Sequence, residues 1–205
     1  MAKKALSPGP RGQAGARGGG ERIDWPATLA VGRPRELDQV QWRQRLAPPP
    51  ALWLIIVDSS ASTRRQGALS AAKGLLQTVF DQAYRQRANL AVMTAAGRAP
   101  QWARQGLKAS FALQPWLAQL GAGGGSPLVE ALASARAWLA RRRRQRPHER
   151  QHCLVLTDGR LHFDRVAPLG CDTALVDLER TSIRLGRAQQ LARLLDATCW
   201  HIDQL

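Results

Sequence analysis

Acid and hydroxyl residues follow directly on an apolar stretch in the first third of the chain. Residues 54–57 are Leu-Ile-Ile-Val, and residues 58–62 are Asp-Ser-Ser-Ala-Ser. Asp58, Ser60 and Ser62 are spaced two residues apart, so a turn brings one carboxylate and two hydroxyls toward a single point. Oxygen ligands without His or Cys suit a hard cation, with water in the remaining positions. The pattern therefore predicts a Mg²⁺ site.

Two later segments have the composition expected of the rest of that site. Residues 123–127, Gly-Gly-Gly-Ser-Pro, form a flexible loop that presents the hydroxyl of Ser126 just before a helix. Residues 154–159, Leu-Val-Leu-Thr-Asp-Gly, predict a second buried strand that ends at Asp158. The alternative is that Asp58 caps the following helix and Asp158 opens a turn, as Asp does in many proteins. That alternative leaves the coincidence of the three segments unexplained.

Buried parallel strands are the elements that must position these groups. Continuous aliphatic runs such as residues 54–57 are typical of strands buried on both faces of a parallel sheet. Ligands of such sheets bind in the crevice outside the carboxyl ends of the strands. Further strands are expected at 90–95, 173–176 and 198–202, and helices at 65–87, within 107–120, at 128–139 and at 187–195. The alternation predicts an α/β fold, a doubly wound and mostly parallel sheet flanked by helices. Ser126 is expected at the N-cap of the helix that starts near Leu128.

Composition divides the chain into three parts. Residues 1–21 are rich in Gly, Pro and Arg and predict a disordered tail. Residues 22–50 form an N-terminal extension, whose apolar residues, among them Trp25 and Trp42, are expected to pack on the main domain. Residues 51–205 form that domain.

Positive charge dominates, with 30 Lys and Arg against 15 Asp and Glu and a formal net charge of +15. Such a balance indicates acidic partners or polyanions. The densest basic run, Arg141, Arg142, Arg143 and Arg144, falls at a predicted helix C-terminus and is our candidate partner-binding surface. Docking of an acidic protein segment is the plainer interpretation. Nucleic-acid binding is the less favoured one, because no recognisable nucleic-acid motif supports it.

The targeting and cysteine signals indicate a cytoplasmic protein without a membrane segment. Lys3 and Lys4 are not followed by the apolar run of a signal peptide, and no stretch approaches the length of a membrane span. Cys153, Cys171 and Cys199 lack C-x-x-C spacing, so we expect buried thiols in a reducing compartment rather than a zinc site.

Catalysis by this chain is not expected. The loop at residues 121–126 has the glycines of a phosphate loop but lacks its Lys-Ser/Thr, so no ATP hydrolysis is expected. Ser60 and Ser62 are not part of a Gly-x-Ser-x-Gly elbow, which argues against a hydrolase nucleophile. Asp58 and Asp158 could form an acid–base pair, but a shared cation explains the surrounding hydroxyls better.

Together the three segments resemble the metal-ion-dependent adhesion site (MIDAS) of von Willebrand factor A (vWA) domains. That site consists of Asp-x-Ser-x-Ser, a loop Thr and a strand-end Asp. Here Ser126 replaces the Thr and keeps the hydroxyl. By this resemblance Ser60, Ser62 and Ser126 would bind Mg²⁺ directly, and Asp58 and Asp158 would bind it directly or through water.

A more specific resemblance is to the C-terminal domain of the magnesium-chelatase D subunit, from about Arg22 to the end of the chain. The matching segments are 22–29 (Arg-Ile-Asp-Trp-Pro-Ala-Thr-Leu), 123–128, 156–160 (Leu-Thr-Asp-Gly-Arg), 176–180 (Val-Asp-Leu-Glu-Arg), 184–186 with Ala188, and 201–203 (His-Ile-Asp). The AAA+-like domain and the acidic linker of that subunit have no counterpart in this sequence. The chain therefore resembles a stand-alone form of the domain.

The resemblance implies a non-catalytic subunit of an ATP-dependent magnesium or cobalt chelatase. Its partners would be an AAA+ ATPase subunit, which hydrolyses ATP, and a large tetrapyrrole-binding subunit, on which the metal is inserted, as in cobalamin biosynthesis. Three alternatives stay open. They are a vWA partner of a MoxR-type AAA+ chaperone, a basic nucleic-acid-associated protein, and a hydrolytic enzyme that uses Asp58 and Ser60.

Overall fold

The computed structural model describes residues 21–44, 49–60, 67–108, 113–121, 123–163, 166–181 and 185–205. The predicted ligand Ser62 and almost all of the predicted disordered tail, residues 1–21, lie outside the described residues. The chain divides into two compact units, Met1–Pro48 and Pro49–Leu205.

The first unit is a short strand–helix–strand arrangement. Strand β1 (Glu21–Ile23) pairs antiparallel with β2 (Trp42–Gln44), and between them lie α1 (Trp25–Val31) and the 3₁₀ turn η1 (Leu37–Gln39). Asp24 caps α1, and its Oδ1 accepts a hydrogen bond from the backbone N–H of Ala27 at 3.2 Å. The buried Thr28 joins the helix to the returning chain, because its Oγ1 accepts from the Gln41 N–H at 2.9 Å. Packing of this unit on the main domain stays a prediction.

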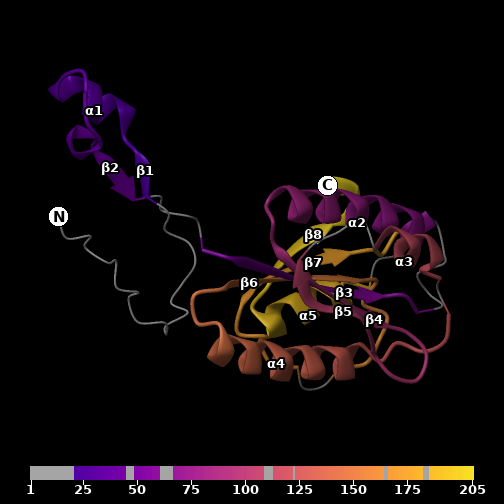
Figure 1. The fold of residues 1–205 in the computed structure, drawn as a ribbon. Helices are drawn as coiled ribbons and strands as arrows, with labels where there is room; N and C mark the ends of the chain where they lie inside the picture. The colour runs from indigo at the N-terminus through magenta and orange to yellow at the C-terminus, as the bar shows by residue number, and fades with distance from the viewer. Residues whose placement is uncertain are drawn as a thin grey trace. The chain divides into compact units, whose positions relative to one another are not determined.

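Within the described residues the second unit contains a six-stranded sheet in the order β5-β4-β3-β6-β7-β8 (Figure 1). All neighbours run parallel except β4 and β5, which are antiparallel. The strands are β3 (Ala51–Asp58), β4 (Asn89–Ala95), β5 (Gln101–Lys108), β6 (Arg150–Thr157), β7 (Asp172–Asp177) and β8 (Thr198–His201). The helices are α2 (Ala68–Arg85), α3 (Gln114–Gln119), α4 (Leu128–Gln145) and α5 (Arg187–Leu195), followed by the 3₁₀ turn η4 (Ile202–Gln204).

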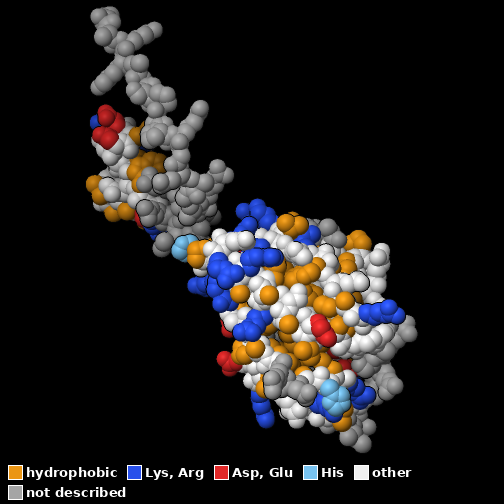
Figure 2. All heavy atoms as spheres, turned by 90° about the horizontal axis from the view of Figure 1, so that it is seen from below, with side chains coloured by type: hydrophobic (Ala, Val, Ile, Leu, Met, Phe, Trp, Pro, Cys, Tyr) orange, Lys and Arg blue, Asp and Glu red, His pale blue; other side chains and the backbone are white. Residues whose placement is uncertain are grey.

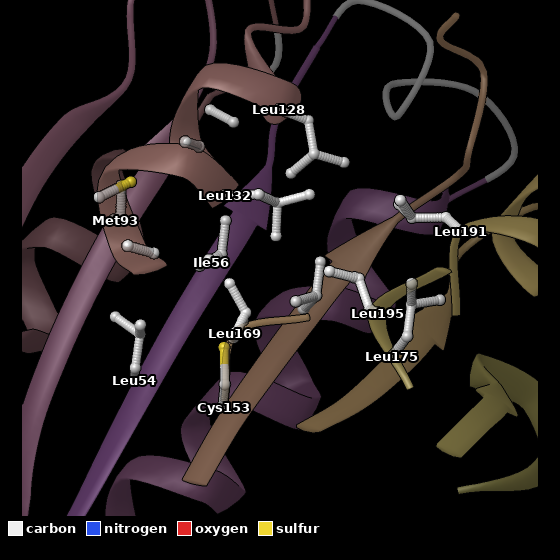
Figure 3. Packing of buried hydrophobic residues seen from close by; sticks show 14 of the residues in the cluster. Leu54, Ile56, Met93, Leu128, Leu132, Cys153, Leu169, Leu175, Leu191 and Leu195 are labelled. Carbon is white, nitrogen blue, oxygen red and sulfur yellow. The ribbon is translucent and has the colours of Figure 1, made fainter. Parts of the chain in front are cut away.

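Helices cover both faces of this sheet, which confirms the predicted α/β class. Helices α2 and α3 lie on one face and α4 and α5 on the other (Figure 1). Along β3 the side chains alternate between the two cores. Leu54 and Ile56 pack with α4 and α5 (Figure 3), and Ile55 and Val57 pack with α2 and α3. Burial on both faces explains why β3 reads as a continuous aliphatic run.

Three features differ from the sequence expectation. Strand β5 was not predicted, because it is an edge strand whose residues are mostly exposed or half-buried, and half of them are polar. Helix α4 continues to Gln145, well beyond the predicted end at residue 139, because arginines are good helix formers. The N-cap of α4 is Pro127 and no side chain caps it, so the prediction of Ser126 as N-cap was wrong.

No helix in the described part of the chain is long and apolar enough to span a membrane.

Candidate metal-binding site

Asp58 and Thr157 meet because their strands are adjacent and parallel. Strands β3 and β6 pair in a register that places Val57 beside Leu156, so both strands end at the same edge of the sheet. There Asp58 Oδ2 accepts a hydrogen bond from Thr157 Oγ1 at 2.8 Å. This bond connects residues 99 positions apart in the sequence. The sequence analysis had treated Thr157 only as part of the strand.

Asp58 is 1% exposed, and its carboxyl group receives hydrogen bonds but forms no ion pair within the described residues. Its second oxygen, Oδ1, accepts from the Ser60 N–H at 3.1 Å. Burial raises the pKa of Asp58, and the nearby charge of Asp158 raises it further, while the bonds from Thr157 and Ser60 oppose both effects. The charged form of Asp58 is therefore costly without a cation beside it.

Asp158 belongs to a tight turn that packs on α5. It is 5% exposed, and its Oδ1 accepts from the Arg160 N–H at 3.1 Å. Gly159 has a φ of +67°, and a Cβ there would lie 2.6 Å from the backbone nitrogen of Ala188. Only glycine fits both the backbone angle and this close approach. The N-terminus of α5 thereby fixes the turn that presents Asp158.

Arg160 is the nearest basic residue in sequence, but its guanidinium is bonded elsewhere. Its Nη2 donates to Thr181 Oγ1 at 3.1 Å and forms an ion pair with Glu179 Oε1 at 3.4 Å. Glu179 is 2% exposed, and its Oε2 also accepts from the Leu185 N–H at 2.9 Å. The sequence analysis noted Glu179 only within the family-like segment at 176–180. Because Arg160 is engaged with Glu179, it does not neutralise the pair Asp58 and Asp158.

The glycine loop is fixed by contacts with two strand ends, whereas the sequence analysis had interpreted it as flexible. Gly123 N–H donates to Ser59 O at 3.0 Å, and Gly97 N–H donates to Gly125 O at 3.1 Å. Gly124 has a φ of +74°, and a Cβ there would lie 2.8 Å from Gly97 Cα. The glycines therefore allow close backbone packing. Gly97, in the turn after β4, has a role that its sequence context did not indicate.

This packing holds Ser126 next to the ends of β3 and β4. The Oγ atom of Ser126 is buried and has no hydrogen-bond partner among the residues that the structure describes. The Oγ atom of Ser59 is also buried and has no hydrogen-bond partner among the described residues. Buried hydroxyls without partners are uncommon, and each costs free energy unless a ligand satisfies it. Ser126 therefore fits the role of a metal ligand on an observation independent of the sequence motif. Ser59 was not predicted to matter.

The described residues thus bring Asp58, Ser60, Ser126 and Asp158 to one edge of the sheet. Ser60 is 6% exposed. Two carboxylates and neutral hydroxyls are a donor set that suits Mg²⁺, with water completing the coordination. No group of three or more His, Cys, Asp or Glu residues that could hold a metal occurs within the described ranges. Among the described residues, a cation at this edge would therefore need hydroxyl and water ligands in addition to Asp58 and Asp158.

The four arginines at 141–144 differ in their contacts. Arg142 Nη2 donates to Glu149 Oε1 at 2.8 Å, and its guanidinium stacks 5.3 Å from the ring of Trp138. Arg143 donates to the carbonyl of Gly170 and, at 3.3 Å, to Gln151 Oε1. Arg141 and Arg144 are exposed. Lys and Arg side chains cluster at one end of the face in Figure 2, which looks onto α4. Partner binding by this run stays a prediction, and Arg142 and Arg143 already have intramolecular partners.

The family comparison agrees with this architecture. The model of the von Willebrand factor type A domain matches residues 53–160, which include most of β3, the glycine loop and Asp158. A Mycobacterium tuberculosis protein described as uncharacterized is 31% identical over 166 residues, covering 75% of this chain. The chain spans only 26% of the length of that relative.

Solved structures with similar folds share little sequence with this chain. An aerotolerance-related membrane protein from Bacteroides fragilis superposes with a TM-score of 0.59 at 15% identity, covering 74% of this chain and 90% of its own. The VWA domain of SpRpn10 gives a TM-score of 0.52 at 16% identity, with coverages of 75% and 88%. Proximal thread matrix protein 1 from the mussel byssus gives 0.57 at 12% identity, with coverages of 76% and 43%. At these identities the likeness concerns the fold alone.

Proposed function

Since this chain belongs to the von Willebrand factor type A domain family, we propose that it is a non-catalytic binding module that holds Mg²⁺ at the carboxyl edge of its sheet. The ligands would be Asp58, Ser60, Ser62, Ser126 and Asp158, directly or through water. A partner protein would complete the coordination with a carboxylate. The described residues fit such a site, and Ser62 lies outside them.

One observation carries the proposal. A buried carboxylate without an ion pair, Asp58, and a buried hydroxyl without a hydrogen bond, Ser126, come from different loops and lie at the same edge of the sheet. Each alone would be an isolated cost to stability. A single divalent cation between them would satisfy both.

The chemistry that Mg²⁺ would supply is attraction for an anionic ligand. Ser60 and Ser126 are neutral, so they withdraw little of the cation's charge. Asp58 keeps the orientation given by Thr157 and the Ser60 N–H. Asp158 is held by the Arg160 N–H and the packed glycine turn. These residues would leave a coordination position open toward the partner.

The finer assignment extends the same proposal. On the resemblance of residues 22–205 to the chelatase D subunit, the partners would be an AAA+ ATPase subunit and a large tetrapyrrole-binding subunit. This chain would couple ATP hydrolysis by the first to insertion of magnesium or cobalt by the second. The inserted metal would be cargo, distinct from the Mg²⁺ of the site.

Titration calorimetry and partner capture test the proposal in two steps. Mg²⁺ binding by the purified full chain is measured for the wild type, for Asp58→Ala and for the control Asp172→Ala. Asp172 is an exposed acid at the opposite, amino-terminal end of β7. We expect Asp58→Ala to abolish Mg²⁺ binding and Asp172→Ala to leave it unchanged. The same proteins then serve as bait in source-cell lysate, with Mg²⁺ or with EDTA.

The captured proteins decide between the specific roles. Mg²⁺-dependent capture of an AAA+ ATPase together with a large tetrapyrrole-binding subunit supports the chelatase assignment. Capture of a MoxR-type ATPase alone argues for the chaperone alternative. Wild-type Mg²⁺ affinity in Asp58→Ala would refute the site. Partner capture that does not depend on Mg²⁺, but is lost when Arg141 and Arg144 are neutralised, would refute the proposal. The partner would then bind to a basic docking surface instead.

A further inference from the structure

A groove of about 150 Å³ lies between α4 and the connection from β6 to β7. Its lining is apolar apart from one arginine and consists of Val129, Leu132, Ala133, Arg136, Val166 and Ala167. In Figure 2, hydrophobic side chains gather over the middle of the face that α4 covers, with Lys and Arg side chains and fewer Asp and Glu side chains around them. Among the described residues the groove lining contains no acidic side chain.

The groove follows from an unusual crossover. Parallel neighbours such as β6 and β7 are usually joined by a helix that packs on the sheet. The described residues between these strands, 158–163 and 166–171, contain no helix. Leu169 is buried in the core beside α4, whereas Ala167 is exposed at the groove. One side of α4 therefore lacks the cover that a crossover helix provides, which leaves apolar surface accessible.

The groove begins close to the proposed cation site. Val129, Leu132, Ala133 and Arg136 are spaced i, i+3, i+4 and i+7, so they form one stripe along α4. Val129 is in the first turn of the helix, three residues after Ser126. At 1.5 Å per residue the stripe extends about 10 Å along the helix from there. A ligand bound at the sheet edge can thus reach the groove without leaving the surface.

The charges select the kind of ligand. Arg136 is exposed at the groove, and the chain as a whole has a formal net charge of +15. An acidic segment is attracted by both and is also the kind of ligand that supplies a carboxylate to a cation. The apolar walls of the groove favour an aliphatic side chain on the same segment.

We propose that the groove is the second half of one docking surface, taking an aliphatic side chain of an acidic partner segment whose carboxylate completes the cation site. This inference rests on the proposed function, because the carboxylate needs the Mg²⁺. The groove lining on α4 lies 3 to 10 residues beyond Ser126, or about 5–15 Å along the helix. An extended chain advances about 3.3 Å per residue, so the aliphatic side chain is about two to five residues away from the carboxylate. The partner is a protein segment that combines both features.

Methyl NMR of the full chain with synthetic peptides tests the inference. The probes are peptides with one Asp and one Leu on a Gly-Ser background, with the Leu one to eight residues from the Asp, and matched peptides with Ala in place of Leu. Each is titrated with Mg²⁺ and with EDTA. We expect Mg²⁺-dependent shifts of the Val129 and Ala133 methyls and about tenfold tighter binding for Leu than for Ala at spacings of two to five residues.

Paired variants locate the effect in the groove. Ala133→Trp fills the groove, and Ala137→Trp places the same ring at an exposed site outside the groove lining on the same helix. Arg136→Glu reverses the groove charge, and Arg85→Glu makes the same change at an exposed position in the last turn of α2, on the other face of the sheet. We expect Ala133→Trp to remove the preference for Leu over Ala, and Arg136→Glu to weaken binding of every Asp peptide. The two controls should behave like the wild type.

The outcomes distinguish failure of this inference from failure of the proposed function. Mg²⁺-dependent binding with equal affinity for the Leu and Ala peptides, unaffected by Ala133→Trp, refutes the groove and leaves the cation site standing. Absence of Mg²⁺ binding by calorimetry refutes both. Leu-dependent shifts that persist in EDTA, or no shifts at millimolar peptide, also overturn the proposal. So would Overhauser contacts from the Val129 and Ala133 methyls to another segment of this chain or to a second copy.

Discussion

Asp58 and Asp158 at one end of the central sheet and Glu149 at the other are all buried, but of these three only Glu149 has a counter-charge beside it within the described residues. At the carboxyl ends of β3 and β6, Asp58 and Asp158 are buried without an ion pair in the described structure. At the amino end of β6, the side chain of Glu149 is fully buried and forms an ion pair with Arg142. The same sheet thus contains one acid site with its counter-charge and one without.

Their titration behaviour reflects this difference. Burial alone would raise the pKa of Glu149, but hydrogen bonds from Arg142 and Asn89, together with the charge of Arg142, outweigh it and hold the pKa below its ordinary value. The distances are 2.8 Å from Asn89 Nδ2 and 2.8 Å from Arg142 Nη2 to Glu149 Oε1. For Asp58 burial dominates, and its pKa lies above its ordinary value.

The comparison distinguishes two uses of a buried charge. Glu149 and Arg142 tie the end of α4 to the amino-terminal end of the sheet, and Asn89 extends the network to β4. Such a network is complete within the chain and contributes to the fold. Asp58 and Ser126 form an incomplete set, which a cation would complete. An incomplete set costs stability, and a ligand can recover that cost.

Breaking the complete network should have the largest effect. Glu149→Gln leaves the guanidinium of Arg142 largely buried without its counter-charge, so we expect a loss of about 3–5 kcal/mol in the free energy of unfolding. Urea denaturation of the wild type and the variant measures it. Arg144→Gln, at an exposed position of the same helix, should change stability by less than about 0.5 kcal/mol.

A second substitution shows whether the unpaired charge is the cause. In the double variant Glu149→Gln with Arg142→Met no buried charge remains, so part of the lost stability should return. Equal instability of the single and double variants would mean that packing, rather than charge pairing, holds this end of the sheet together. Mg²⁺ affinity should be unchanged in all of these proteins, because the network is at the opposite end of the sheet.

Binding of Mg²⁺ by the incomplete set, Asp58 and Ser126, should have the next largest effect on stability. If Mg²⁺ binds at Asp58 as proposed, a concentration a hundredfold above its Kd stabilises the folded chain by about 2.7 kcal/mol. For a domain of this size the melting temperature should rise by roughly 5–10 °C, which calorimetry would detect. Asp58→Asn should abolish this increase, and Asp172→Asn should retain it. A wild-type response in Asp58→Asn would place any bound Mg²⁺ elsewhere.

A smaller effect is expected from the loop that positions Ser126. Gly124→Ala puts a Cβ at 2.8 Å from Gly97 Cα on a backbone with a φ of +74°, so the loop must shift. We expect Mg²⁺ affinity to fall about tenfold, or ~1.4 kcal/mol, and stability to fall by ~1 kcal/mol. Gly123→Ala is the matched control, because a Cβ there meets no atom within 4 Å. Equal Mg²⁺ affinities for the two variants would show that the close packing of the loop does not matter.

The parts of the fold that follow from hydrophobic pattern were predictable from the sequence. The aliphatic runs of β3, β4 and β6 and the stripes of α2 and α5 reveal burial directly, and the predicted helix at 187–195 has the bounds observed for α5. Strand β5 was not predictable in this way, because it is at the edge of the sheet among the described residues, half of its residues are polar, and its one buried residue is Gly106. No helix was predicted between the strands at 154–159 and 173–176, and the described residues of this crossover contain none, since Leu161, Phe163 and Val166 pack on the core without helical spacing.

In the candidate site, too, the residues were predictable from the sequence, whereas the contacts that hold them in place were not. The motif located Asp58, Ser60, Ser126 and Asp158, because their types and order along the chain are visible in the sequence. The partners that fix them were not visible. Thr157 bonds to Asp58 across 99 positions, and Gly97 supports Gly124 through a backbone contact that no residue pattern encodes. The internal pairing of Arg142 likewise depends on Glu149, which lies beyond the end of α4.

The smallest effect, and the one that tests the comparison most directly, is the sign of the pH dependence. The pKa of Glu149 is lowered from 4.5, so its contribution to stability is complete above that value and is lost as pH falls through the folded-state pKa. The pKa of Asp58 is raised from 3.8, so its cost is absent below that value and develops as pH rises through the folded-state pKa. Each slope is at most about 1.4 kcal/mol per pH unit.

Urea denaturation from pH 3 to pH 7 in EDTA, with Glu149→Gln, Asp58→Asn and the control Asp172→Asn, separates the two signs. The stability difference between the wild type and Glu149→Gln should shrink toward acid pH, because protonation removes the ion pair in the wild type. Relative to the wild type, Asp58→Asn should gain stability as pH rises, because it removes a buried charge that lacks a counter-ion. Asp172→Asn should follow the wild type. A stability of Asp58→Asn that falls relative to the wild type as pH rises would mean that Asp58 has a cationic partner within the chain. The contrast between the two ends of the sheet, and with it the argument for a ligand at the carboxyl edge, would then fail.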